Sequence, residues 1–405
     1  PAIKIPMLDG QFSFKRGDLT IVSGYANMGK ALDISTQIPT IDGWKTMADI
    51  NIGDVVFDEF GKQCNVTNIS DVQHNRTCYE LIFSDGSKVV CDEEHLWNTY
   101  TVAARVSEAR QNNRTRKTYA LDQRHKCIKP KTRTTKEIAD TIIVNSKRGR
   151  PNHSINICGP IETAEAKLEI DPYVLGYWLG DGDTAGGSIT TASDEVICNI
   201  RNRGFAVTKH KAIYRYGIIG LKAKLRKENL LNNKHIPMAY LRSSINQRNW
   251  LLNGLMDSDG YIDKDGMCEF SVTKERLANE FYELITSLGI KASIKKSDAR
   301  LYGRFISHRY RIRFKPRFNV FTIKENIKRH RDGSKRNYRY IVSCEKTETV
   351  PVKCISVDSP TKTYLCTKSY IPTHNSTFSA NLAYLMTMEH LWKWAVFAGE
   401  QHPQD

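Results

Sequence analysis

The sequence lacks the features that mark a secreted or membrane-embedded protein. Its ten cysteines include no Cys-x-x-Cys pair and no regular spacing, and the 405 residues contain neither a signal peptide nor a long apolar run. A disulfide framework and a membrane partner are therefore not expected. We expect a chain that works in a reducing compartment, the cytoplasm, and that is long enough to form two or three domains with cores of their own.

Acidic residues are scarce relative to basic ones. The chain carries 60 Lys and Arg against 44 Asp and Glu, for a net charge of +16. The flanks 1–30 and 376–405 carry +2 and −2, so the whole surplus falls on residues 31–375. A surplus of this size predicts a polyanionic partner, with nucleic acid as the first candidate, and a merely solvated basic surface is the alternative.

A phosphate-binding loop is present but incomplete. Residues 24–30 read Gly-Tyr-Ala-Asn-Met-Gly-Lys and lack the hydroxyl residue that ends this motif. Residues 376–377, Ser-Thr, supply it far downstream, and the joined pattern G-x-x-x-x-G-K-S-T cradles phosphates with its amides while the hydroxyl meets magnesium. We therefore interpret residues 31–375 as an insertion that must be excised before the loop can form. The nucleotide-binding residues expected after rejoining are Gly24, Gly29, Lys30, Ser376 and Thr377.

The two flanks predict the start of an α/β nucleotide-binding domain. Residues 18–23 read as a buried strand, 376–390 as the helix after the loop, and 394–398 as the next strand. Joined, they resemble the RecA-like ATPase core of hexameric replicative helicases. Thirty residues on each side are too few for an ATPase, so ATP and Mg²⁺ are expected only in the ligated host protein.

Both ends of the insertion predict β structure. Residues 31–61 alternate apolar residues with turn signals, and 78–97 read as a hairpin around Ser-Asp-Gly-Ser. Strands are also expected over 338–343 and 350–357. The insertion then closes on Thr-His-Asn at 373–375.

The downstream junction carries groups suited to cutting and rejoining a backbone. The side-chain amide of Asn375 can attack its own carbonyl and form a succinimide, which breaks the chain after it. His374 can polarise that carbonyl or protonate the leaving group. The Ser376 hydroxyl can hold an acyl group as an ester before passing it to its own amine. The tripeptide alone means little, but it falls on the boundary that the broken loop defines.

The insertion as a whole resembles an intein, with a mainly β HINT (horseshoe-like) splicing domain in two pieces. Most inteins begin with Cys or Ser, whereas this one begins with Ala31, whose methyl group cannot attack a carbonyl. Cys354 stands where most inteins have Asp. Trp97 lies two residues after His95, and Thr373 lies in the closing segment. The combination is similar to the class 3 inteins, which lack an N-terminal nucleophile.

That resemblance implies an order of reaction on the chain's own exteins. The Cys354 thiolate attacks the Lys30 carbonyl, and His95 gives a proton to the departing Ala31 amine. The acyl group then moves to the hydroxyl at the downstream junction, the terminal asparagine cyclises, and an oxygen-to-nitrogen shift completes the new peptide bond without any cofactor. The family pattern Thr-x-x-His reads Asp-Glu-Glu-His at 92–95, so residue 92 has no assigned role.

Two related segments, 171–182 and 249–260, lie in the middle of the chain. Each reads as an apolar helix with small residues on one face that ends in Asp-Gly, and a strand and a second helix follow each. An internal duplication of this kind predicts a pseudo-two-fold pair of subdomains. The helix ends would bring Asp181 and Asp259 together. Two close carboxylates in a basic domain suit Mg²⁺ and the hydrolysis of phosphodiesters.

Residues 160–329 resemble the LAGLIDADG homing endonucleases. The resemblance implies an α+β domain of αββαββ repeats, monomeric with internal pseudo-symmetry, whose saddle-shaped sheets lie in the major groove of double-stranded DNA at the intein-less host gene. It also implies that Asp181 and Asp259 are metal-binding catalytic acids and that Lys234 is a catalytic lysine. Leu179 departs from the family, which often has an acid there.

Residues 103–150 are rich in Lys and Arg and poor in large apolar residues. A solvated, partly flexible insertion and an arm on DNA phosphates are both open. Cys91 and Cys366 are expected to be structural. The expected domains are an N-extein fragment (1–30), the first HINT part (31–161), the endonuclease (162–329), the second HINT part (330–375) and a C-extein fragment (376–405).

Two other functions remain open from the sequence. One alternative is a precursor of the ordinary intein class that a Cys-to-Ala change at position 31 has disabled. It also fits a DNA-binding protein or nuclease whose HINT part is inert. A prokaryotic or viral host is expected in each case.

Overall fold

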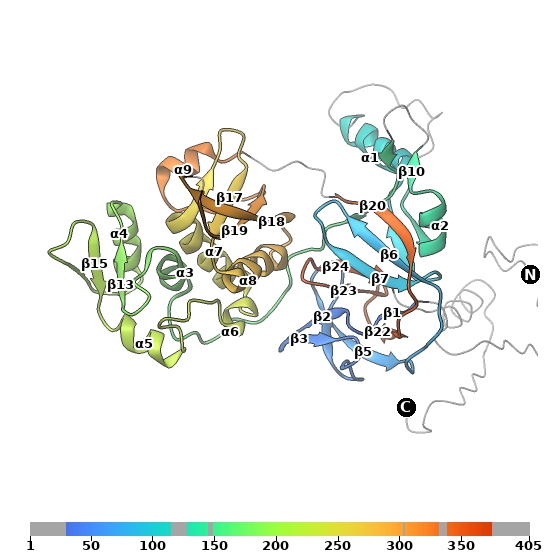
Figure 1. The fold of residues 1–405 in the computed structure, drawn as a ribbon, viewed down its shortest axis with the longest axis horizontal. Coiled ribbons are helices and arrows are strands. Elements are labelled where there is room, and N and C mark those ends of the chain that lie inside the picture. The colour runs from blue at the N-terminus through green and yellow to red at the C-terminus, as the bar shows by residue number, and fades with distance from the viewer. Residues whose placement is uncertain (1–29, 115–127, 145–148, 303, 332–337, 375–405) are drawn as a thin grey trace, which may run out of the picture.

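The computed structural model describes residues 30–114, 128–144, 149–302, 304–331 and 338–374, and these form two lobes (Figure 1). One lobe consists of β-strands from both ends of the described chain, and the other is α+β. The strands and helix expected at 18–23, 376–390 and 394–398 lie outside the described residues. Within the described ranges, no helix is long and apolar enough to cross a membrane.

The β lobe contains two larger sheets. The first has the strand order β12-β20-β6-β7-β1-β21, and the second has the order β22-β5-β4-β2-β3. The strands of these sheets are β1 (Leu32–Asp33), β2 (Gln37–Thr40), β3 (Gly43–Thr46), β4 (Val55–Phe57), β5 (Gln63–Ile69), β6 (Cys78–Phe83), β7 (Lys88–Asp92), β12 (Ser154–Asn156), β20 (Tyr338–Thr347), β21 (Val352–Lys353) and β22 (Ile355–Val357).

The hairpin predicted over 78–97 is present as β6 and β7. Gly86 adopts φ +87° in the turn, a conformation that glycine reaches without steric cost. Asp85 in the same turn is buried and pairs with Arg339 of β20, whose side chain is also buried. The ion pair fixes the late strand β20 against the early hairpin, and Cys344 lies opposite Leu81 in the resulting register.

The first strand of the insertion lies between two distant strands. Leu32 of β1 pairs with Lys353 of β21 on one side and with Cys91 of β7 on the other, both antiparallel. Residues that are more than 300 positions apart in sequence are therefore adjacent at this point. Smaller two-stranded ladders of the lobe include β8 (Leu96–Thr99) with β9 (Lys131–Thr134), and β23 (Thr363–Cys366) with β24 (Ile371–His374).

The basic segment 103–150 is folded where the structure describes it. Its helix α2 (Thr135–Asp140) begins at a capping box in which Thr134 and Glu137 exchange hydrogen bonds. A longer helix, α1 (Val102–Arg114), precedes it, and the short strands β10 (Ile143–Val144) and β11 (Arg150–Pro151) pair after it. These parts of the segment are therefore folded, and β9 and α2 pack against β8 and β20 of the β lobe.

The α+β lobe contains the predicted repeat. Each half begins with a long helix and continues through strands, a second helix and further strands, but the first half has only the bridge between Gly182 and Ile189 where the second has β16. The elements are α3 (Pro172–Asp181), β13 (Ser188–Thr190), α4 (Asp194–Asn202), β14 (Val207–Lys209), β15 (Arg215–Ile218), α5 (Leu221–Lys227), α6 (Met238–Leu241), α7 (Ile245–Asp259), β16 (Gly260–Ile262), β17 (Cys268–Val272), α8 (Glu275–Ser287), β18 (Ala292–Leu301), β19 (Arg304–Phe314) and α9 (Lys324–Arg329).

The helices α3 and α7 approach closely because glycines face each other. A Cβ at Gly176 would lie 2.3 Å from the Leu251 carbonyl oxygen, and one at Gly254 would lie 2.2 Å from the Tyr173 carbonyl oxygen. Neither position has room for a larger residue without a backbone shift. The predicted role of small residues at the shared axis agrees with this packing.

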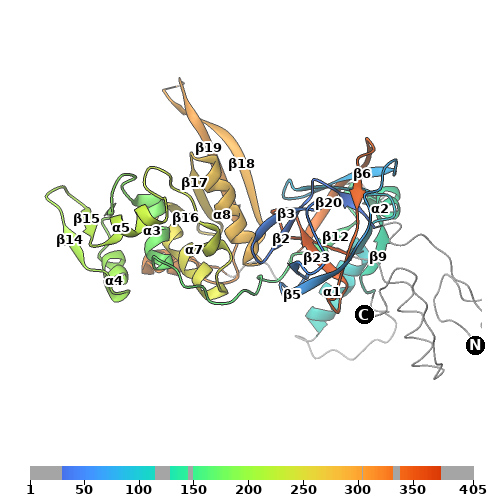
Figure 2. The ribbon, with the colours of Figure 1, turned by 90° about the horizontal axis from the view of Figure 1, so that it is seen from below.

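A long hairpin of β18 and β19 extends from the α+β lobe (Figure 2). Its exposed side chains are strongly basic. They include Lys295, Lys296, Arg300, Arg304, Arg309 and Arg313. The hairpin lies at the edge of the sheet β16-β17-β19-β18 and therefore presents positive charge from a rigid ladder.

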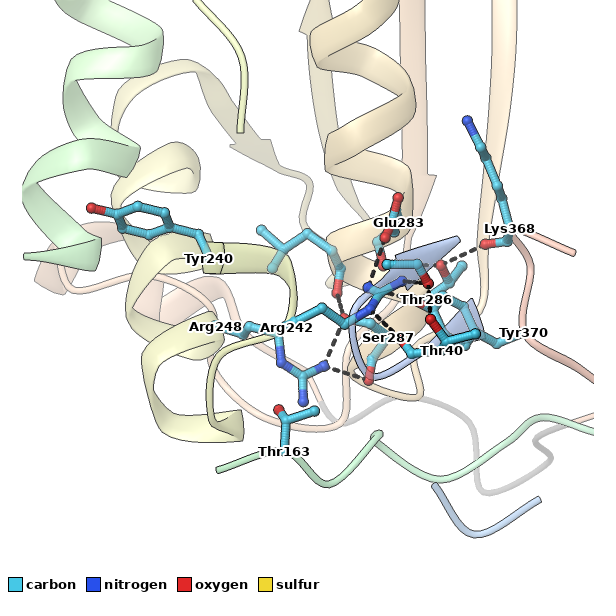
Figure 3. Close-up of polar contacts among 12 residues, drawn as sticks. Thr40, Thr163, Tyr240, Arg242, Arg248, Glu283, Thr286, Ser287, Lys368 and Tyr370 are labelled. Atoms are coloured by element: carbon cyan, nitrogen blue, oxygen red, sulfur yellow. Dashed lines mark hydrogen bonds and ion pairs between the residues drawn. The ribbon is translucent and has the colours of Figure 1, made fainter. Parts of the chain in front are cut away.

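The two lobes meet through a buried arginine (Figure 3). Arg242 follows α6 and donates to the Thr40 carbonyl (2.9 Å) and the Glu283 carboxylate (2.8 Å). It also donates to the Tyr370 hydroxyl (3.2 Å) and the Gly43 carbonyl (3.2 Å). Because a buried charge is costly unless it is paired, this set of partners makes the interface specific.

Candidate functional site

The upstream junction lies in the centre of the β lobe. Ala31 is fully buried and packs in one apolar cluster with Cys78, Val352 and Cys354. Leu32 of β1 lies opposite Lys353 of β21, so the next residues along, Ala31 and Cys354, also lie close together. The side chain of Cys354 is therefore adjacent to the residue that follows the Lys30 carbonyl.

Cys354 is a buried thiol. Its backbone N–H donates to the Ser70 hydroxyl at 3.0 Å, which holds the residue between β21 and β22. Burial raises the pKa of the thiol to about 12, and the charge of Lys30 lowers it in part. A group with this pKa is protonated at neutral pH, so its use as a nucleophile requires a base nearby.

His95 and Trp97 lie beside the same junction. The His95 and Trp97 rings meet edge-on with centroids 4.9 Å apart. His95 Nε2 shares a short hydrogen bond with the Thr373 hydroxyl of β24. Burial lowers the pKa of His95 to about 3, and the Lys30 backbone carbonyl at the ring offsets part of that effect. The imidazole is therefore neutral over the physiological pH range.

Thr135 supports both rings from the basic segment. Its hydroxyl accepts from Trp97 Nε1 at 3.1 Å and donates to the His95 carbonyl at 3.1 Å. Thr135 was not expected at this site from the sequence, because residues 103–150 have the composition of a charged insertion. The Thr-x-x-Glu capping box at 134–137 was the available signal for a folded element there.

The last described residues of the insertion also lie near His95. His374 ends β24, opposite Thr363, and directly follows Thr373, whose hydroxyl contacts the His95 ring. A small polar pocket next to His374 is lined by Glu59, Asn98, Tyr100 and Asn156, among others. Asn375, Ser376 and Thr377 lie outside the described residues, as do Gly24 and Gly29.

Cys91 and Cys366 are buried thiols in the β lobe. Burial raises the pKa of both, and neither shares the Ala31 cluster with Cys354. Cys91 contacts the Thr135 hydroxyl at 3.2 Å. Their surroundings agree with the structural role expected from the sequence.

Asp181 and Asp259 lie together at the C-terminal ends of α3 and α7. A Cβ at Gly180 would lie 3.0 Å from Asp259 Oδ2, so this carboxylate reaches across to the partner helix. Burial raises the pKa of both acids, and the charge of Asp181 raises that of Asp259 further. Two carboxylates, one half-buried and one exposed, that repel each other in this way fit a divalent cation between them.

Lys234 lies next to this carboxylate pair. Its ammonium group donates to the Gly180 carbonyl (3.0 Å) and the Gly182 carbonyl (2.8 Å) at the end of α3. Burial lowers its pKa to about 8, against the opposing charges of Asp259 and Asp181. The structure thus brings together the three residues that the sequence assigned to this site. Leu179, where the family often has an acid, is buried in the core.

The protein supplies few ligands of its own here. Among the described residues, no group of three or more His, Cys, Asp or Glu side chains is arranged to hold a metal. Mg²⁺ is bound by one or two carboxylates together with substrate phosphates in many nucleic-acid enzymes. The Asp181 and Asp259 pair fits that mode of binding rather than an all-protein cage.

Comparison with known sequences agrees with these observations. Residues 246–319 match a family model described as the LAGLIDADG-like domain. The chain is 35% identical over 390 residues to the replicative DNA helicase DnaB of Mycobacterium intracellulare, an alignment that covers 94% of this chain and 64% of that protein. It is also 37% identical over 83 residues to DnaB of Mycobacterium leprae (strain TN), covering 20% of this chain and 14% of that protein. The chain thus spans less than two thirds of the length of these relatives.

Solved structures of two kinds align with the chain. The MchDnaB-1 intein aligns at 14% identity over 85% of this chain and 100% of that chain, with a TM-score of 0.27. I-DmoI in complex with DNA and Mn aligns at 18% identity over 40% of this chain and 93% of that chain, with a TM-score of 0.26.

A β lobe built from both ends of the insertion and an α+β lobe with a LAGLIDADG-like domain have the arrangement of an intein that carries a homing-endonuclease domain. By sequence, the chain is similar to the replicative helicase DnaB of Mycobacterium intracellulare over 94% of its own length.

Proposed function

We propose that residues 31–375 excise themselves and join Lys30 to Ser376, beginning with attack of the Cys354 sulfur on the Lys30 carbonyl. The observation that supports this proposal best is the antiparallel pairing of β1 with β21. It places Ala31 against Cys354 in a dry cluster, where attack needs little reorganisation of the backbone.

The later steps use the downstream junction. The acyl group moves from the Cys354 sulfur to the Ser376 oxygen, Asn375 cyclises with the help of His374, and an oxygen-to-nitrogen shift leaves a peptide bond after Lys30. Every step before cyclisation exchanges one acyl linkage for another. The reaction therefore requires no ATP and no metal.

The test is to express the chain and weigh its products. Splicing yields a ligated 60-residue peptide and a free 345-residue fragment. We expect Cys354→Ala to abolish ligation, whereas Cys344→Ala, another buried cysteine of the β lobe, should still splice. Normal splicing by Cys354→Ala would contradict direct attack. If the wild-type chain is inert and Ala31→Cys splices, the chain is instead a disabled precursor of the ordinary class.

We also propose that residues 162–329 cut double-stranded DNA at the host gene that lacks the intein. Asp181 and Asp259 would hold Mg²⁺ with the DNA phosphates, and the cation would neutralise the charge that develops on the phosphate. Lys234 holds the α3 terminus through two carbonyls and would meet the same phosphate. The basic β18–β19 hairpin would contact the DNA backbone.

This second activity has its own test. Cutting of a plasmid with the intein-less host site should require a divalent cation and should be lost in Asp181→Asn or Asp259→Asn. Asp194→Asn, an exposed acid at the start of α4, is the matched control and should cut normally. Binding without cutting by the wild-type chain would leave a DNA-binding module only.

The remaining expectations follow from these activities. We propose a cytoplasmic location in a prokaryotic or viral host, where the DNA target and the host helicase are both present. We propose that the nuclease acts as a monomer, since one chain already contains both halves of the pseudo-two-fold pair. ATP and Mg²⁺ would bind only after ligation restores the phosphate loop at Gly24, Gly29, Lys30, Ser376 and Thr377.

A further inference from the structure

A buried carboxyl group lies at the upstream scissile bond and has no role in the reaction described above. Asp92 ends β7, and its backbone N–H donates to the Ala31 carbonyl at 3.1 Å. Its side chain is fully buried, and its Oδ2 accepts from Arg76 at 3.2 Å. Its Oδ1 is also buried, and no described residue forms a hydrogen bond of ordinary geometry with it. A buried polar oxygen in this state is uncommon and indicates a function.

Asp92 is a direct neighbour of the residue whose nitrogen must leave. Its backbone pairs with Ala31, and Ala31 packs in one cluster with Cys354. Burial raises the pKa of Asp92, and Arg76 and then the Ala31 N–H lower it in part. The charge of Asp92 also raises the pKa of the Cys354 thiol. The carboxyl group therefore lies next to Ala31, which carries the departing nitrogen and contacts the residue that attacks.

The first step needs a proton to move between these two atoms. The Cys354 sulfur must lose its proton to attack, and the Ala31 nitrogen must gain one to leave as an amine. His95 is neutral, its Nε2 is engaged by Thr373, and the Lys30 carbonyl lies at the same ring. In this arrangement His95 is better suited to polarising the Lys30 carbonyl than to donating a proton to the Ala31 nitrogen.

We propose that the Asp92 carboxylate is a catalytic proton relay for the first step of splicing. It takes the proton from the Cys354 thiol as the carbon–sulfur bond forms. It then gives that proton to the Ala31 nitrogen as the carbon–nitrogen bond to Lys30 breaks. One thiol proton becomes one amine proton, so the step balances without an external acid or base. The inference rests on the proposed splicing function.

The groups around Asp92 are one ion-pair partner and several neutral side chains, so Asp92 is the group among them that titrates. Arg76 is its ion-pair partner and is shared with the exposed Glu94 at 3.0 Å. The remaining neighbours are neutral because burial raises the pKa of each. They are Cys78 and Cys91 on the adjoining strands, Cys354 after β21 and Tyr364 on β23.

The experiment compares Asp92→Asn with Glu94→Gln in the full chain. Both changes remove a carboxylate from Arg76, but only the first removes the group at Ala31. The first step is followed as thiol-released N-extein, and C-terminal cleavage at Asn375 is followed separately. We expect D92N to slow the first step by about 100-fold, the scale of general acid–base catalysis, and to leave C-terminal cleavage unchanged. E94Q should react at the wild-type rate.

The pH dependence of the first step distinguishes a proton relay at Asp92 from a purely structural role of Asp92 in β7. The wild-type first step should have an acidic limb, because protonated Asp92 cannot accept the thiol proton, and D92N should lack that limb. If D92N is also less stable, Asp92→Glu keeps the acid, and at a matched unfolding temperature it should react faster than D92N. A D92N variant with the wild-type rate and profile, or a D92E variant no faster than D92N, would overturn the relay.

Failure of the splicing proposal itself has a different outcome. In that case the wild-type chain releases no N-extein with thiol, or Cys354→Ala releases it as readily. A wild-type chain that forms the thioester, together with an unaffected D92N, refutes the relay alone.

Discussion

At the scale of single residues, the β lobe keeps several polar groups at the junctions neutral by burying them. His95 is the clearest case, because its pKa falls to about 3 in the folded chain from the ordinary value of 6.5. Between these values the unfolded chain binds a proton that the folded chain does not. Stability is therefore present above pH 6.5 and is lost as the pH falls toward 3.

This linkage predicts a pH-dependent melting temperature. We expect thermal stability to fall as the pH is lowered from 6.5 to 5, with a slope of up to about 1.4 kcal/mol per pH unit from His95 alone. In His95→Gln the slope over the same range should be smaller, because one fewer proton is taken up on unfolding. Unfolding monitored by circular dichroism at several pH values measures both slopes, and equal slopes would show that His95 is not buried neutral.

Thr135 yields a second prediction at this scale. Thr135→Val keeps the shape of the side chain but leaves Trp97 Nε1 without its acceptor, while the His95 carbonyl keeps only the Thr135 backbone N–H. We expect a loss of about 1–3 kcal/mol in stability, the cost of unsatisfied buried groups, and slower splicing. Thr132→Val, at an exposed position of β9, is the control and should change neither quantity. Denaturant unfolding and product mass measure the two effects.

At the scale of elements, the axis of the α+β lobe depends on the contact between α3 and α7. We expect Gly176→Ala to cost about 1–3 kcal/mol, because its Cβ would overlap the Leu251 carbonyl and push the helices apart. The same shift would separate Asp181 from Asp259 and reduce DNA cutting. Cys198→Ala on α4, at an exposed position, should be neutral in both assays. Wild-type cutting by Gly176→Ala would show that the helix distance does not set the metal site.

Local patterns predicted these elements well. The hairpin β6–β7 follows from alternation around a Gly turn, and a strand and a second helix, α4 or α8, follow each long helix of the repeat as predicted. The meeting of Asp181, Asp259 and Lys234 followed from the repeat and the resemblance. Each of these signals is contained in a short window or in a direct comparison of two windows.

The parts that sequence could not predict depend on contacts between distant segments. Asp92 lies beside Ala31 only because β7, β1 and β21 form one sheet. The spacing of residues in the sequence does not predict this contact. Thr135 reaches Trp97 from a segment whose composition predicts a solvated insertion. In both cases the partner lies tens of residues away, so side-chain type alone carried no information about the role.

At the scale of the whole molecule, Arg242 links the two lobes. We expect Arg242→Met to cost about 3–5 kcal/mol, because Glu283 would remain buried without its partner. Arg276→Met removes an exposed arginine from its pair with Glu280 on α8, and because Glu280 still accepts from the Ile236 backbone N–H, the change should cost less than about 1 kcal/mol.

The unfolding temperature and the splicing rate together test this role of Arg242. If the interface is as specific as its contacts indicate, Arg242→Met lowers the unfolding temperature and slows splicing, and Glu283→Gln in the same chain restores part of the stability. Equal effects of the Arg242 and Arg276 variants would show that the buried pair is not an important part of the interface.

Arg242 also bears on how such a chain could shrink. A minimal version that loses the nuclease but keeps both splicing segments would leave the Thr40 and Gly43 carbonyls facing an open gap, and the rings of Trp44 and Tyr370 would meet water. Water would then serve as the donor to both carbonyls, whereas the two rings would lose their apolar cover. We therefore expect the loss of the DNA-cutting half to be accompanied by a change that covers these rings again in the half that remains.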